Sequence, residues 1–81
     1  MQKQMSIAHM EEMVELGAIA AVFVVPFPMS EKWALWAQAS NGTEYVLTTA
    51  RGEQREFASL KTVVEVLRAA GWRKPVTLHL V

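Results

Sequence analysis

The spacing of apolar and polar residues marks two helical segments along the chain. Apolar residues recur at helical spacing over residues 6–16, with glutamates on the other side, Ser6 placed to cap the start and Gly17 to end the helix. A second helix is predicted over residues 60–70, with Ser59 as its cap and an apolar stripe made of Leu60, Val63, Val64 and Leu67. Each helix therefore has one face suited to packing on a sheet.

Three further segments have the composition of strands. Residues 18–25 contain no polar side chain, which is typical of a strand buried on both faces. In an alternative interpretation the first helix continues through residues 18–21 and the strand starts at Val22. Residues 54–58 indicate a short strand with Phe57 pointing inward. A last strand is predicted over residues 76–81, with Val76, Leu78 and Leu80 inward and an edge open to pairing with a second copy.

The clearest local signal is a hairpin. Strand-like runs over residues 32–39 and 43–50 flank Asn41-Gly42, a pair that favours a two-residue type I′ turn. Pairing across such a turn puts one set of residues on one face, namely Trp33, Leu35, Ala37, Val46 and Thr48. The opposite face receives Trp36, Gln38, Tyr45, Leu47 and Thr49. Both faces then carry large apolar groups, so we expect one tryptophan to pack under the helices and the other to meet a partner.

Together these elements predict a single α+β domain over residues 1–81. We expect an antiparallel-dominated sheet of about four to five strands, with two helices on one side, in the order α-β-β-β-(β)-α-β. Apolar residues make up 52% of the 81 positions, a surplus for a chain with so little interior. This surplus, the two-faced hairpin and the last strand together predict a homodimer.

The composition argues against catalysis and against a metal or cofactor site. The chain has no cysteine and no aspartate, and its two histidines, His9 and His79, lie far apart without acids at ligand spacing. Each glycine is explained as a cap or a turn, so no phosphate-binding loop is expected. The longest apolar run, residues 17–29, is too short for a membrane helix, and the first residues lack the layout of a signal peptide. We therefore expect a cytoplasmic, non-enzymatic protein.

The distribution of charge adds candidate binding residues to a chain whose net charge is zero. Residues 51–81 hold six of the eight basic residues but only three of the eight acidic ones. Arg51, Arg55, Arg73 and Lys74 are the candidates for binding nucleic acid. In the alternative interpretation these cations complement the helix dipole or pair with neighbouring glutamates. For a protein partner the candidates are Trp36 and Tyr45, because aromatic anchors dominate such contacts.

A set of turn and core residues within residues 33–72 points to a class of proteins. The set is Trp33-Ala34-Leu35-Trp36, Asn41-Gly42, Leu47-Thr48-Thr49-Ala50-Arg51-Gly52, Arg55-Glu56-Phe57-Ala58-Ser59-Leu60 and Leu67-Arg68-Ala69-Ala70-Gly71. It resembles small accessory proteins of bacterial plasmids and integrative elements, some of them partition-associated in the manner of plasmid ParC. The resemblance covers about half the chain, implies plasmid maintenance or transfer as the setting, and carries over no functional residues.

Two functional hypotheses follow from the sequence. In the first, an accessory protein of a plasmid or mobile element binds DNA in maintenance, partition or regulation. In the second, the chain is a dimeric protein-interaction adaptor of the same machinery and makes no nucleic-acid contact. DNA binding should weaken steeply as salt rises, whereas apolar protein contacts should change little.

Overall fold

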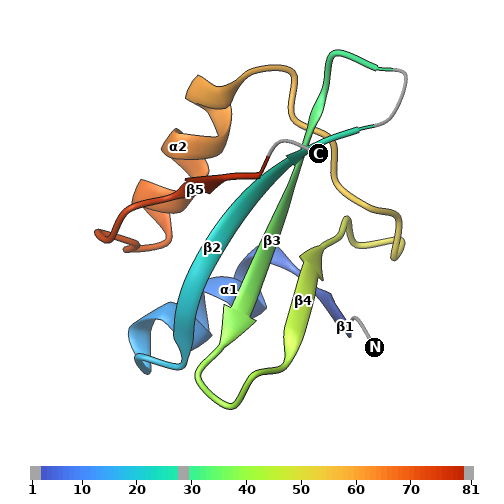
Figure 1. Ribbon diagram of the computed structural model, residues 1–81. Coiled ribbons are helices and arrows are strands. Elements are labelled where there is room, and N and C mark those ends of the chain that lie inside the picture. Colours follow the sequence, from blue (N-terminus) through green and yellow to red (C-terminus); the bar gives the residue numbers. More distant parts are fainter. Residues whose placement is uncertain (1–2, 28–29, 80–81) are drawn as a thin grey trace.

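The computed structural model describes residues 3–27 and 30–79 and has an α+β fold (Figure 1). Its elements, in chain order, are β1 (Lys3–Met5), α1 (Ile7–Glu15), β2 (Ile19–Pro26), β3 (Trp33–Ala39), β4 (Glu44–Leu47), α2 (Leu60–Ala69) and β5 (Thr77–Leu78). The five strands form one sheet in the order β1-β4-β3-β2-β5. The two inner pairs, which β3 makes with β2 and β4, are antiparallel, and the two outer pairs are parallel. The α+β class and the dominance of antiparallel pairing are therefore confirmed, and the parallel pairs at both edges make the sheet mixed.

Both helices begin and end where the local sequence predicts. The hydroxyl of Ser6 accepts a hydrogen bond from the backbone N–H of His9 at 3.1 Å, and Ser59 does the same for Thr62 at the start of α2. Gly17 follows α1 with a φ of 71°, a backbone conformation that glycine adopts without a steric penalty. The strand β2 starts directly afterwards, so the alternative in which the first helix continues through residues 18–21 is wrong.

The chain topology explains why both helices lie on the same side of the sheet. Two connections link parallel strands that lie three places apart in the strand order of the sheet. One runs from β1 through α1 to β2, and the other runs from β4 through α2 to β5. Both connections cross the sheet in the same direction. Because such crossovers are nearly always right-handed, two that run the same way place their helices on one face. The opposite face carries neither helix (Figure 1).

The core lies between this pair of helices and the sheet. Its largest fully buried side chains come from both helices and from four of the strands, and they are Met5, Met10, Leu35, Leu47, Leu67, Val22 and Val63. Trp33 packs against the edge of this core and Phe57 is 3% exposed. The predicted inward position of Phe57 is therefore confirmed, and of the two faces predicted for the hairpin strand the one with Trp33 and Leu35 is the covered one.

Several short elements differ from the sequence prediction. The strand β1 was not expected, although its Met5 is 1% exposed and its backbone carbonyl accepts a bond from Thr48. Residues 54–58 form two isolated bridges, Thr48 with Gln54 and Trp33 with Phe57, instead of a strand. The last strand is an edge strand as predicted, but β5 covers only Thr77–Leu78, and Leu80 lies outside the described residues.

The hairpin forms, but its register is one residue away from the prediction. The N–H of Ala39 donates to the carbonyl of Thr43 at 2.8 Å, which leaves a loop of Ser40, Asn41 and Gly42 between the strands. Gly42 has a φ of 90°, so the connection is a three-residue loop with a left-handed glycine, instead of the two-residue turn. Consequently Trp36 pairs with Val46, and Ala37 pairs with Tyr45. Every β4 side chain therefore lies on the face opposite to the predicted one.

The apolar stripe of α2 is only half covered. Val63 and Leu67 are buried, whereas Leu60 and Val64 are 39% and 38% exposed. The helical spacing of the predicted stripe is thus confirmed, but the sheet covers only half of its residues.

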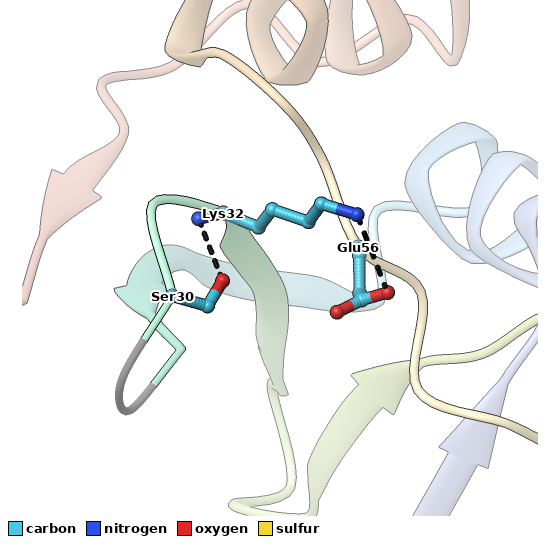
Figure 2. Close-up of polar contacts among 3 residues, drawn as sticks. All are labelled: Ser30, Lys32 and Glu56. Atoms are coloured by element: carbon cyan, nitrogen blue, oxygen red, sulfur yellow. Dashed lines mark hydrogen bonds and ion pairs between the residues drawn. The ribbon is translucent and has the colours of Figure 1, made fainter.

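A polar contact joins the start of β3 to the segment that leads into α2 (Figure 2). The backbone N–H of Lys32 donates to the hydroxyl of Ser30. The side-chain ammonium of Lys32 lies 3.9 Å from the carboxylate of Glu56. Both charged side chains are about half exposed, so the pair contributes little to stability. Glu56 therefore forms an ion pair with Lys32. Within residues 3–27 and 30–79, no ion pair involves Arg51 or Arg55.

Candidate interaction surfaces

The uncovered face of the sheet has an apolar centre. The register of β4, β3 and β2 brings Val46, Trp36 and Phe23 into one row across the three middle strands. Val25 follows two residues after Phe23 and points the same way. The side chains of all four residues are partly exposed, because neither of the two described helices covers this face. We call this surface, together with its polar surroundings, the open face.

Polar residues surround that apolar centre. Gln4 and Thr77 lie at the two ends of the row, Gln38 and Glu44 lie along one side of it, and His79 lies on the other side, beside Val25. A cleft of about 320 Å³ runs over the face, and its lining residues are Phe23, Val25, Trp36, Gln38, Glu44 and His79. The described strands contribute no Lys or Arg to this face, because their one basic residue, Lys3, pairs with Tyr45 on the other face. An apolar centre with a polar rim is the usual anatomy of a protein–protein interface.

Trp36 occupies the middle of the open face and has an unusual environment. It lies on β3, the central strand of the sheet, in the central row. Its indole Nε1–H group is buried, and the described residues provide no acceptor for it. A buried donor without an acceptor costs on the order of 1–3 kcal/mol. Such a cost at the centre of an uncovered surface needs an explanation, and a functional role is one.

Tyr45 does not share a surface with Trp36, contrary to the predicted hairpin pairing. It pairs with Ala37 and packs against the core on the helix-covered face. There its ring meets that of His9 edge-on, with a centroid separation of 5.8 Å. The two aromatic residues predicted for a protein interface therefore point to opposite sides of the sheet.

The four cations predicted to contact nucleic acid fall into two separate pairs. Arg51 and Arg55 lie in the segment between β4 and α2, on the right of Figure 1, whereas Arg73 and Lys74 lie between α2 and β5 on the left. The guanidinium of Arg55 lies 5.8 Å from the centre of the Phe57 ring. A single surface containing all four residues is thus not assembled.

Arg73 and Lys74 line a cationic cleft. Its volume is about 550 Å³, and its lining residues are Val64, Leu67, Arg68, Trp72, Arg73, Lys74 and Val76. The Nη1 group of Arg73 donates to the carbonyls of Arg68 and Trp72, at 3.0 and 3.2 Å. The ammonium of Lys74 lies 5.8 Å from the centre of the Trp72 ring. These contacts fix two cations at the rim of an aliphatic cleft, and no carboxylate lines it.

Sequence reasoning missed part of each surface. Phe23 was not selected because it belongs to an unbroken apolar run. Val46 was not selected because it was predicted to lie on the face of Trp33, opposite to that of Trp36. The exposure of Val64 and Leu78 depends on where the sheet ends, which no local pattern shows. Arg68 was recognisable from its place in the last turn of α2, beside Arg73 and Lys74.

Neither a metal site nor a membrane-spanning helix is found in the part of the chain that the structure describes. Within residues 3–27 and 30–79, no three His, Cys, Asp or Glu side chains gather closely enough to hold a metal ion. None of the helices there is long and apolar enough to cross a membrane.

Comparisons with known proteins add no relative to this picture. No protein-family model matches the chain, and no curated protein or solved structure matches it. The resemblance to partition-associated plasmid proteins therefore stays a prediction.

Proposed function

We propose that this protein is a non-enzymatic interaction module that associates with a second copy of itself through the open face. The observation that carries the proposal is the row of Val46, Trp36 and Phe23 on a sheet face that neither helix covers. Sheets with such a face usually bury it against another layer. A second sheet is one layer that fits, because two sheets pack face to face through interdigitating side chains.

The symmetry and charge of the open face favour a second copy as its partner. Trp36 lies at the centre of the sheet, so a two-fold axis through the centre brings the two Trp36 rings together. Apolar centre then meets apolar centre, and polar rim meets polar rim. Glu44 is the only carboxylate among the cleft-lining residues, and no Lys or Arg lines that cleft. Two copies can therefore approach without a cluster of like charges.

The size of the face sets the expected affinity. Strands of these lengths, spaced about 4.8 Å apart, give a projected face of about 400 Å² per copy. Side-chain relief raises the accessible area above this projection. A face-to-face pair is then close to the lower limit of specific interfaces, which bury about 1,200–2,000 Å² in total. We therefore expect a dimer that exchanges with monomer, with a dissociation constant in the micromolar range.

The experiment is sedimentation equilibrium of the wild type and of two lysine variants over a range of concentrations. Val46→Lys places a charge in the apolar row, whereas Leu16→Lys adds the same charge at a residue that is 73% exposed at the end of α1. The wild type and Leu16→Lys should dimerise with the same constant. Val46→Lys should stay monomeric while its amide spectrum remains dispersed. A monomeric wild type at high micromolar concentration, or equal association of all three proteins, would refute the proposal.

DNA binding in plasmid maintenance remains a hypothesis from the sequence. The geometry supports it less well, because Arg51 and Arg55 are separated from Arg73 and Lys74. Titration of the protein with a mixed-sequence duplex at two salt concentrations tests it directly. Amide shifts at both pairs that shrink as salt rises would support one extended contact with DNA.

A further inference from the structure

The apolar stripe of α2 extends past the edge of the sheet. Val63 and Leu67 are buried against the core, but Val64 lines the cationic cleft beside Val76, which precedes β5. Leu60 is one helical turn before Val64 and is exposed to the same extent. Leu78 of β5 is 45% exposed. Near β5, α2 therefore presents apolar side chains that the described residues leave partly uncovered.

The outer edge of β5 has backbone groups in position to pair with another strand. Among the described residues, β5 pairs only with β2. The N–H of His79 donates to the carbonyl of Val24 at 2.9 Å, and Val24 is in register with Leu78. In a parallel ladder with this register, the backbone groups of Thr77 and His79 face β2. The N–H and the carbonyl of Leu78 consequently face outward, along the free edge.

The cations at the end of the same cleft add a charge preference. Arg68, Arg73 and Lys74 line it, and none of its lining residues carries a carboxylate. Arg73 is held by two backbone carbonyls through Nη1 alone, and a guanidinium has further N–H donors for a carboxylate. The cleft therefore combines aliphatic walls with positive charge, and the free edge of β5 begins directly after Val76, one of its lining residues.

We propose that this cleft binds an extended peptide segment of a partner protein, which adds to the edge of β5 as a sixth strand. Apolar side chains at alternate positions of the segment would cover Val64 and Leu78, and an acidic end would face Arg73 and Lys74. Strand addition of this kind derives affinity from main-chain hydrogen bonds and specificity from pockets for alternate side chains. The site adjoins the polar rim of the open face at β5, but it uses the outer edge of that strand and does not depend on self-association.

Nucleic acid is a poorer match to the same cleft. Trp72 is 6% exposed, so its ring is not free to stack on a base. The aliphatic walls provided by Val64 and Val76 also contribute nothing to binding a phosphate backbone. A peptide with both apolar and acidic side chains uses all the features of the cleft.

The experiment measures fluorescence anisotropy with labelled, end-blocked peptides. Two probes, Glu-Glu-Val-Thr-Val-Thr-Val and Val-Thr-Val-Thr-Val-Glu-Glu, place the acidic pair at either end, because a sixth strand can run in either direction. We expect one of them to bind and the counterpart with lysine in place of glutamate to bind at least about tenfold more weakly. Amide shifts on binding should lie at Val76, Leu78 and the Arg73–Lys74 segment. Equal binding of the acidic and basic peptides would overturn the proposal.

Two matched pairs of variants test the cleft residues. Lys74→Glu should weaken binding of the acidic peptide by about tenfold or more, whereas Lys61→Glu, the same change outside the cleft, should leave it unchanged. Leu78→Pro removes the outward N–H, and edge strands tolerate such a proline. Leu78→Ala keeps the N–H. Leu78→Pro should bind much more weakly than Leu78→Ala while retaining a folded spectrum.

Other outcomes would assign the cleft to a different occupant and reject the peptide. Binding of a DNA duplex that is lost in Lys74→Glu, without binding of either peptide, would favour nucleic acid. Loss of self-association in Leu78→Pro would favour a second copy paired along β5. Peptide shifts centred on Phe23 and Trp36 would place the contact on the open face instead.

Discussion

The two faces of the sheet differ in how their side chains are covered, although the residues of the two faces alternate along the same strands. Leu35 and Trp36 are neighbours on β3. Leu35 is completely buried under the helices, whereas Trp36 lies in the open face with an indole N–H that has no acceptor among the described residues. On the covered face apolar side chains stabilise the fold. On the open face we infer that side chains of similar hydrophobicity serve association, at some cost to the isolated domain.

A charge introduced on the covered face should disturb this division most. Leu47→Lys places an unpaired ammonium group at a core residue that is 0% exposed, directly beside Val46 of the open face. We expect a loss of more than about 4 kcal/mol in the free energy of unfolding, enough to unfold a domain of this size. Urea denaturation measures it.

The same substitution at the neighbouring residue is the control. Val46→Lys should change the free energy of unfolding by less than about 1 kcal/mol, because Val46 is partly exposed on the open face. A Leu47→Lys variant as stable as Val46→Lys would contradict the observed register of β4.

Truncation on the covered face should have the next largest effect. Leu35→Ala leaves a cavity at a residue that is 0% exposed and should cost about 2–5 kcal/mol of unfolding free energy. Thermal and urea denaturation of the monomeric protein at low concentration measure this cost. A loss below about 1 kcal/mol would contradict a rigid core between sheet and helices.

The smallest effect is expected on the open face. Trp36→Phe removes the N–H that has no acceptor and keeps an aromatic ring, so stability should change by less than about 1 kcal/mol in either direction. Trp72→Phe is the matched control, because the Nε1–H of Trp72 donates to the carbonyl of Pro75 and the residue is 6% exposed. That variant should lose about 1–3 kcal/mol. Equal losses in the two variants would imply that Trp36 has found an acceptor.

Features encoded by neighbouring residues could be predicted from the sequence. The caps Ser6 and Ser59, and glycine at the end of α1, act within one helical turn and were identified correctly. The α+β class follows from the same local patterns. The strand β1 could not be recognised, because three residues are too few to show alternation.

The hairpin register illustrates why local patterns do not suffice for the candidate sites. Asn41-Gly42 is compatible with a two-residue turn and with the observed three-residue loop. Tyr45, Val46 and Leu47 are all apolar or aromatic, so alternation did not distinguish the two registers. The separation of the four cations likewise depends on which strands end at which edge of the sheet, a property of the whole fold.

The arrangement of the strands has a consequence for how the chain acquires this structure. The middle strands β2, β3 and β4 follow one another along the chain, so their pairing closes only short loops. The edges pair residues much further apart, Lys3 with Tyr45 and Phe23 with Thr77, and therefore lose more chain entropy when they close. The meander would form first and serve as the template on which both edges assemble. The edge that we infer to accept a peptide is thus among the last parts to form and among the first to open.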